Sequence, residues 1–129
     1  MSKNLKILVI DDDVTTCSLL ETILQMEDYQ TASANYVDNG GIINLLNQEN
    51  PHLLILDFHL GTKETLEYVT TIRTDVDWQH LPILMTSAID RQQECLVAGA
   101  DQFILKPFDW QEMTKAVKVL SSDAPKKHP

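Results

Sequence analysis

Several side chains with useful chemistry are each the first polar residue, or nearly the first, after a short apolar run of this sequence. They are the carboxylates of Asp11, Asp12 and Asp57, the hydroxyl of Ser87 and the ammonium group of Lys106. Apolar runs this short are typical of strands that are buried on both faces, as in a parallel sheet. Open α/β sheets form their binding crevice at the carboxyl ends of the strands. The sequence therefore predicts that these side chains meet at one edge of a sheet.

The three carboxylates, the lysine and the hydroxyl together indicate a particular chemistry. At about 4 Å and an effective dielectric of about 20, two carboxylates repel by roughly 4 kcal/mol, so they need a proton or a cation between them. Oxygen ligands with few protein contacts suit Mg²⁺, which keeps several of its waters. An aspartate beside a divalent metal, a lysine and a hydroxyl is typical of a site that forms an aspartyl phosphate. There the carboxylate attacks phosphorus, and the metal and the lysine neutralise the charge of the transferred group.

The elements that must position these side chains alternate along the whole sequence. Strand patterns lie at 7–10, 30–34, 53–57, 82–88 and 102–105, and helical patterns follow them at 14–24, 42–46, 66–76, 90–98 and 110–120. Strict alternation predicts an α/β fold, in which helices cover both faces of a five-stranded parallel sheet through right-handed crossovers. The polar strand 30–34 fits an edge, which favours the flavodoxin-like order 2-1-3-4-5.

Length and composition limit the classes of protein to consider. The 129 residues suit one domain, and the net charge of −9 disfavours direct binding to nucleic acid or anionic lipid. The two cysteines have no metal-ligand spacing and are predicted to be reduced, buried thiols. No stretch approaches the roughly 20 apolar residues of a membrane span, and no signal peptide is recognised, which makes the cytoplasm the default location. We predict a domain over residues 1–121 and a disordered tail over 122–129.

At these residues the sequence resembles the receiver domains of response regulators in bacterial two-component signalling, in plan similar to the chemotaxis response regulator. The resemblance spans residues 5–120. It rests on the order and spacing of Ile7–Asp13, Pro51–Asp57, Pro82–Ala88, Gly99–Asp101 and Lys106–Phe108. It implies phosphorelay signalling without catalytic turnover.

For the metal site, the resemblance implies roles at four positions. Asp57 would be the phosphoacceptor and would also bind Mg²⁺. Asp12 would bind the ion directly, Asp11 mainly through water, and His59 through its backbone carbonyl oxygen rather than its imidazole.

For the phosphoryl group and the switch, the resemblance implies that Ser87 and Lys106 bind phosphoryl oxygens. Ser87 would then move, and Phe103 would turn inward as the switch aromatic residue. The peptide bond between Lys106 and Pro107 would be cis.

The resemblance also implies protein partners. The phosphoryl donor would be a histidine kinase or a phosphotransfer protein. A downstream protein would bind the fourth helix, the fifth strand and the last helix, and a phosphorylation-dependent homodimer is left open.

Three features depart from the family pattern or extend it. Gly61 and Thr65 stand where the family often has proline and glycine, so we expect a loop of different shape and greater mobility after the central strand. His59 and Ile89 occupy positions that influence dephosphorylation in the family, and we expect these bulky groups to restrict attacking water. Thr86 adds a second hydroxyl beside Ser87, but strand alternation predicts that it points away from the site.

Other classes of protein fit the sequence less well than a receiver domain does. An aspartyl phosphatase of the haloacid dehalogenase type needs a second aspartate where this chain has His59, and it needs a cap segment. A dinucleotide-binding module needs a glycine-rich turn after the first strand, which is absent. A phosphate-independent scaffold would not need the complete set of site residues. The receiver part of a longer regulator with a separate output domain remains an alternative.

Overall fold

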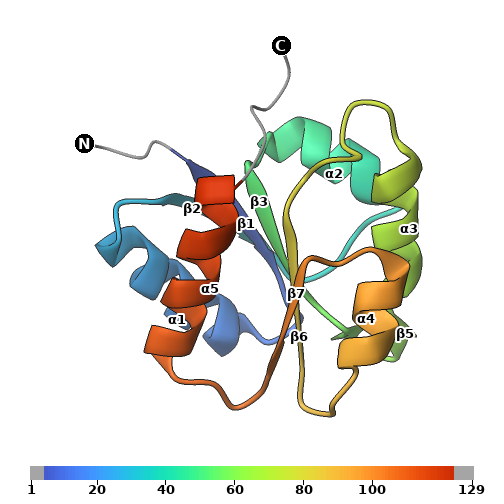
Figure 1. Cartoon of the computed structure of the whole chain (residues 1–129). Helices are drawn as coiled ribbons and strands as arrows, with labels where there is room; N and C mark the ends of the chain where they lie inside the picture. Colours follow the sequence, from blue (N-terminus) through green and yellow to red (C-terminus); the bar gives the residue numbers. More distant parts are fainter. Residues whose placement is uncertain (1–4, 124–129) are drawn as a thin grey trace.

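The computed structural model describes residues 5–123 of the chain. Its strands and helices alternate along the sequence, except where the two short strands β4 and β5 follow β3 (Figure 1). In chain order they are β1 Lys6–Ile10, α1 Val14–Met26, β2 Gln30–Ala34, α2 Gly41–Glu49, β3 Leu53–Asp57, β4 His59–Leu60, β5 Lys63–Glu64, α3 Leu66–Thr74, β6 Ile83–Ser87, α4 Gln92–Ala98, β7 Gln102–Leu105 and α5 Trp110–Asp123.

The main sheet confirms the predicted topology. Its five strands lie in the order β2-β1-β3-β6-β7 and every neighbouring pair is parallel. In terms of the main-sheet strands alone this is the order 2-1-3-4-5. The polar strand β2 is at an edge, and β3 is central with all its residues buried. The strand that carries Asp57 therefore lies between β1 and β6.

Helices cover both faces of the sheet, and each face has its own hydrophobic core. Helices α1 and α5 pack on one face around Leu20, Leu24 and Val117. Helices α2, α3 and α4 cover the other face around Leu46, Ile72 and other buried residues (Figure 1). This is the two-sided arrangement that continuous apolar strands require.

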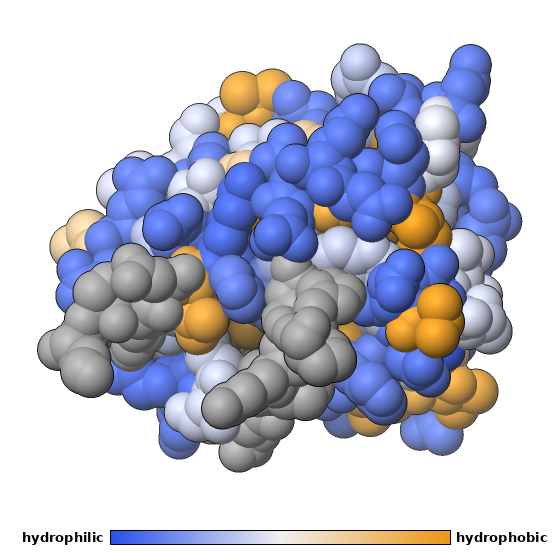
Figure 2. Space-filling model, turned by 90° about the horizontal axis from the view of Figure 1, so that it is seen from above, coloured by the Kyte–Doolittle hydropathy of each residue, from blue (hydrophilic) through white to orange (hydrophobic). Residues whose placement is uncertain are grey.

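The outside of the molecule is mainly polar. The face seen in Figure 2 is mostly hydrophilic, with small, separate hydrophobic spots, in keeping with the net charge of −9. Among residues 5–123, no helix has the length and apolar character to cross a membrane.

The structure corrects the sequence analysis at two places in the elements. Residues after β3, where a loop was expected, form a short antiparallel hairpin of β4 and β5. Val76 lies beyond the end of α3 and is 80% exposed, so it does not extend the apolar stripe.

The C-terminal boundary also differs from the prediction. Helix α5 continues to Asp123, beyond the predicted domain end at residue 121. The rest of the predicted disordered tail lies outside the described residues, so that part remains a prediction.

Candidate functional site

The predicted site residues meet at the carboxyl edge of the main sheet. Asp11 and Asp12 follow β1, Asp57 ends β3, and Ser87 ends β6. Lys106 follows β7, and its backbone N–H donates to the carbonyl oxygen of Ser87 at 2.8 Å. The parallel register brings the ends of strands that are distant in sequence to one place, as the sequence predicted.

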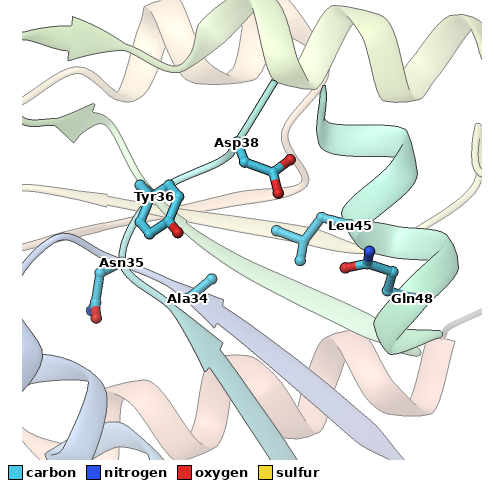
Figure 3. A pocket seen from close by; sticks show the side chains of 6 residues that line it. All are labelled: Ala34, Asn35, Tyr36, Asp38, Leu45 and Gln48. Atoms are coloured by element: carbon cyan, nitrogen blue, oxygen red, sulfur yellow. The ribbon is translucent and has the colours of Figure 1, made fainter. Parts of the chain in front are cut away.

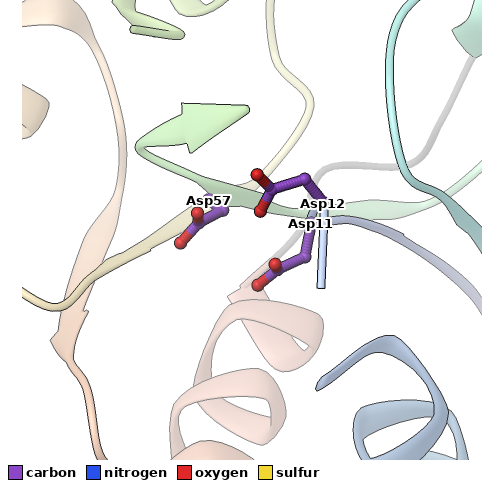
Figure 4. A group of neighbouring side chains, drawn as sticks. All are labelled: Asp11, Asp12 and Asp57. Carbon is purple, nitrogen blue, oxygen red and sulfur yellow. The ribbon is translucent and has the colours of Figure 1, made fainter. Parts of the chain in front are cut away.

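Three aspartates form the acidic centre of this edge (Figure 4). One carboxylate oxygen from each of Asp11, Asp12 and Asp57 lies within 4.8 Å of the other two. Asp11 and Asp57 are buried, at 2% and 8% exposure, whereas Asp12 is exposed. The backbone N–H of Asp13 donates to Asp11 Oδ1 at 2.9 Å and helps to hold this carboxylate, while the side chain of Asp13 caps the start of α1.

The ammonium group of Lys106 bridges the two buried aspartates. Its Nζ lies 2.9 Å from Asp11 Oδ2 and 3.0 Å from Asp57 Oδ1. Burial alone would lower the pKa of Lys106, but hydrogen bonds to both carboxylates outweigh it and raise the pKa above the ordinary 10.5. The lysine therefore stays charged at neutral pH and compensates part of the acidic charge.

The carboxyl group of Asp57 has a pKa that its buried surroundings perturb. Burial raises its pKa above the ordinary 3.8, and the charge of Asp11 adds to the increase. The hydrogen bonds from Lys106 and Thr86 offset only part of this effect. An additional positive charge nearby would strongly stabilise the charged form of this buried carboxylate, which already lies beside a second carboxylate.

At the end of β6, the direction of one hydroxyl side chain differs from the prediction. Thr86 does not point away from the site, because its Oγ1 donates to Asp57 Oδ1 at 3.0 Å. The register explains this result, since Thr86 pairs with Asp57 across β3 and β6. Ser87 is buried beside it, and its Oγ accepts the backbone N–H of Ile89 at 3.1 Å. Sequence alternation located Ser87 but could not supply the register that brings Thr86 to Asp57.

The β4–β5 hairpin is tied to the acidic centre through backbone contacts. Gly61 N–H donates to Asp12 Oδ2 at 2.7 Å. Thr65 is fully buried behind the hairpin, and its hydroxyl lies 2.8 Å from the carbonyl oxygen of Asp57 and 3.2 Å from that of Phe58. The two positions that depart from the family pattern therefore both contact the candidate site.

The side chain of His59 stands beside the site but outside the acidic centre. Within residues 5–123, the side chains that could share one ion are the three aspartates, and the imidazole of His59 is not among them. Its ring packs edge-on against Phe58, with centroids 4.8 Å apart, and its Nε2 lies 4.0 Å from Glu64. The half-buried imidazole is thus held over the hairpin.

Phe103, the predicted switch residue, lies on β7 opposite Met85 of β6. It is partly buried and packs against the core formed by α2, α3 and α4. The peptide bond between Lys106 and Pro107 is cis, as the resemblance implied.

A pocket beside the site is not lined by the acidic side chains of the site. It lies between the end of β2 and α2 and is lined by Ala34, Asn35, Tyr36, Asp38, Leu45 and Gln48 (Figure 3). It contains none of the three aspartates. The chemically useful centre is the acidic edge itself, whose cluster of oxygen atoms fits a small divalent cation such as Mg²⁺.

Comparisons with known proteins agree with this geometry. The sequence matches the response regulator receiver domain family over residues 7–118. It is 30% identical over 118 residues to a Guillardia theta protein described as a probable transcriptional regulator, ycf27. That alignment covers 89% of this chain and 44% of the relative, so the chain spans less than half of the relative's length.

Solved structures have the same architecture. A candidate response regulator of Chloroflexus aurantiacus is 26% identical with a TM-score of 0.83, over 92% of this chain and 98% of that one. The chemotaxis response regulator CheY4 of Vibrio cholerae has a TM-score of 0.79 over 91% of this chain and 98% of that one, and its 22% identity shows a shared fold alone. NtrX of Brucella abortus, 25% identical with a TM-score of 0.81, matches 94% of this chain over only 28% of its own length.

Proposed function

Because the chain belongs to the response regulator receiver domain family of two-component signalling, we propose that it carries a phosphorelay signal through Asp57. It accepts a phosphoryl group on this aspartate from a histidine kinase or a phosphotransfer protein, in a reaction that depends on Mg²⁺. The observation that carries the proposal is the position of Lys106 Nζ, 3.0 Å from Asp57 and 2.9 Å from Asp11 at an edge with three aspartates. Receiver domains are signalling domains rather than turnover enzymes, so the phosphorylated chain is the product that acts.

The transfer step needs one nucleophile and compensation of negative charge. An oxygen of Asp57 donates a lone pair to phosphorus, while the bond from phosphorus to the donor breaks and its electron pair leaves with the donor. Lys106 is positioned to neutralise charge on one phosphoryl oxygen, and the hydroxyl of Ser87 donates to another. No proton has to be removed from Asp57, because it attacks as a carboxylate.

Receiver domains generally bind Mg²⁺ at an acidic pocket, and the residues of this chain fit that ion. Asp11, Asp12 and Asp57 supply carboxylate oxygens, and the backbone carbonyl oxygen of His59 would complete the protein ligands. When bound, the ion supplies positive charge that lets these carboxylates and a phosphoryl group approach one another. Asp12 is the exposed member and therefore the one most open to direct coordination.

The switch proposed from the sequence connects the site to a protein-binding surface. Ser87 would move toward the phosphoryl group, and Phe103 would turn into the space that it leaves. The surface made of α4, β7 and α5 would then change between two states. It exposes large apolar side chains in the unphosphorylated chain, namely Leu96, Val97, Leu105 and Trp110.

Two other functions stay as alternatives. The chain covers 44% of its transcriptional regulator relative, which favours a receiver domain within a longer regulator as one alternative. A scaffold that never accepts phosphate is the other. The acidic cluster with its bridging lysine favours the phosphate acceptor over the scaffold.

Incubation of the chain with acetyl phosphate, with and without Mg²⁺, tests the proposal. We expect labelling of about one phosphoryl group per chain, only with Mg²⁺, at a base-labile site that mass spectrometry assigns to Asp57. The Asp57→Asn variant should not be labelled. Rapid and continuous release of phosphate would indicate an enzyme, and an unlabelled but folded wild-type chain would indicate a scaffold.

A further inference from the structure

Thr86 contacts the proposed phosphoacceptor directly, although strand alternation predicted that its side chain would point away from the site. Its Oγ1 donates to Asp57 Oδ1 at 3.0 Å. Both side chains are buried, with Thr86 at 2% and Asp57 at 8% exposure. A hydroxyl hydrogen bond to a buried carboxylate is shielded from water and is therefore strengthened by the low local dielectric.

The two oxygens of the Asp57 carboxylate have different surroundings. Oδ1 accepts from Thr86 and also lies 3.0 Å from Lys106 Nζ. Within residues 5–123, no hydrogen bond or ion pair of the structure reaches Oδ2. No hydrogen bond in the described part of the chain joins the neighbouring hydroxyl of Ser87 to Asp57, and the Ser87 Oγ accepts the backbone N–H of Ile89.

We propose that Thr86 is a positioning residue that holds Oδ1 of Asp57 as the non-attacking oxygen and favours the unphosphorylated state of the site. The inference rests on the proposed phosphoryl transfer to Asp57. With Oδ1 engaged by two donors, Oδ2 is the oxygen that is free to attack phosphorus.

The bias toward the unphosphorylated state follows from charge. In transfer, Oδ2 forms a bond to phosphorus as the donor leaves with its electron pair, and Oδ1 becomes the neutral carbonyl oxygen of an acyl phosphate. In hydrolysis, water attacks phosphorus, the bond from phosphorus to Oδ2 breaks, its electron pair returns to the carboxylate, and the water proton goes to the released phosphate. A hydrogen bond to a charged acceptor is roughly twice as strong as one to a neutral acceptor. Thr86 therefore stabilises the carboxylate, and the carboxylate character of the hydrolytic transition state, more than it stabilises the acyl phosphate.

Matched variants separate the hydroxyl from the shape of the side chain. Thr86→Val keeps the branched shape and removes the hydroxyl, whereas Thr86→Ser keeps the hydroxyl. Thr86→Ala is a second variant without the hydroxyl, in case valine disturbs folding. Thr31→Val is the control, because Thr31 lies on the edge strand β2 and its hydroxyl donates to Glu21 at 3.2 Å, away from Asp57.

Each protein is labelled with acetyl phosphate and Mg²⁺, the donor is removed by gel filtration, and the remaining phosphoryl group is followed over time. We expect the half-life in Thr86→Val and Thr86→Ala to be about fivefold longer than in the wild type, a ratio equivalent to roughly 1 kcal/mol. Thr86→Ser and Thr31→Val should keep the wild-type half-life. At limiting acetyl phosphate, the variants without the hydroxyl should also reach a higher phosphorylated fraction.

The outcomes distinguish the inference from the function on which it rests. A wild-type chain that accepts no phosphoryl group would reject the proposed function itself. A labelled wild type with an unchanged or shorter half-life in folded Thr86→Val or Thr86→Ala would overturn the role of Thr86 alone. A longer half-life in Thr86→Ser as well would also overturn it, because the effect would then belong to packing rather than to the hydroxyl.

Discussion

The buried charge of Asp57 lowers the stability of the folded chain. Its raised pKa means that the folded chain holds the carboxyl proton more tightly than the unfolded chain does. Between the unfolded value of 3.8 and the folded pKa, unfolding releases a proton, so this group makes stability fall as the pH rises. Above the folded pKa the full cost of the buried charge is present.

We therefore expect Asp57→Asn to stabilise the metal-free chain at pH 7, by on the order of 1 kcal/mol. The gain should shrink as the pH is lowered from 7 through the raised pKa of Asp57, because the wild-type carboxyl group then becomes neutral. Thermal or urea unfolding of both proteins across this pH range measures the difference in their free energies of unfolding. The contributions of the other carboxylates are common to both proteins and cancel in this difference. Saturating Mg²⁺ should stabilise the wild type preferentially. A gain that grows at acidic pH would contradict the raised pKa.

For His59 we propose a different role at the residue scale, in which its side chain acts on attacking water rather than on charge. Its half-buried ring stands over the hairpin next to Asp57 and packs against Phe58. We predict that His59→Asn opens a path for attacking water and shortens the half-life of the phosphoryl group severalfold, on the order of 1 kcal/mol in the barrier. His80→Asn is the matched control, since His80 is exposed and lies between α3 and β6. Equal half-lives in wild type and His59→Asn would reject this role.

Among the elements, the β4–β5 hairpin is the one most closely tied to the site. Its turn favours glycine, because Gly61 has φ +63° in the left-handed region, and the Gly61 N–H donates to Asp12 Oδ2 at 2.7 Å. A Cβ at this position would meet no atom within 4 Å, so the cost of a side chain would come from the backbone conformation alone.

Gly61→Ala should lower the free energy of unfolding by about 1 kcal/mol, since residues other than glycine pay this cost in the left-handed region. Gly41→Ala is the matched control, because Gly41 has φ +86° and is equally unobstructed. Urea unfolding should show a similar loss in both variants. Only Gly61→Ala should also change Mg²⁺ affinity in an equilibrium titration, because only Gly61 contacts a candidate ligand. Identical Mg²⁺ affinity in the two variants would separate the hairpin from the ion site.

Among the elements, the strands of the main sheet could be predicted from the sequence, whereas their register and the short hairpin could not. Apolar runs followed by polar residues predicted the strands and the edge where Asp57 and Lys106 meet, because burial and strand direction are local properties. The register between β3 and β6 is a property of two distant segments, and it alone places Thr86 beside Asp57. The hairpin was missed because its strands, His59–Leu60 and Lys63–Glu64, are too short to show alternation.

The whole molecule depends on one sheet that separates two cores. Leu20 lies in the core under α1 and α5, and Ile72 lies in the core under α2, α3 and α4; their exposures are 1% and 0%. Strands β1, β3 and β6 contribute side chains to both cores, so neither layer can lose its packing without exposing the other. The chain should therefore unfold as one cooperative unit.

Leu20→Ala and Ile72→Ala should each lower the free energy of unfolding by about 2–5 kcal/mol, because each leaves a cavity in a closed core. Urea unfolding is followed by helical circular dichroism and by the fluorescence of Trp78, which is buried in the α2–α4 core. Trp110 is 54% exposed and is replaced by phenylalanine so that the fluorescence reports Trp78 alone. The two probes should give coincident transitions in both variants. If Leu20→Ala lost helical signal while the Trp78 signal stayed native, the two layers would be independent, and a switch at the shared edge would need another route to the surface of α4, β7 and α5.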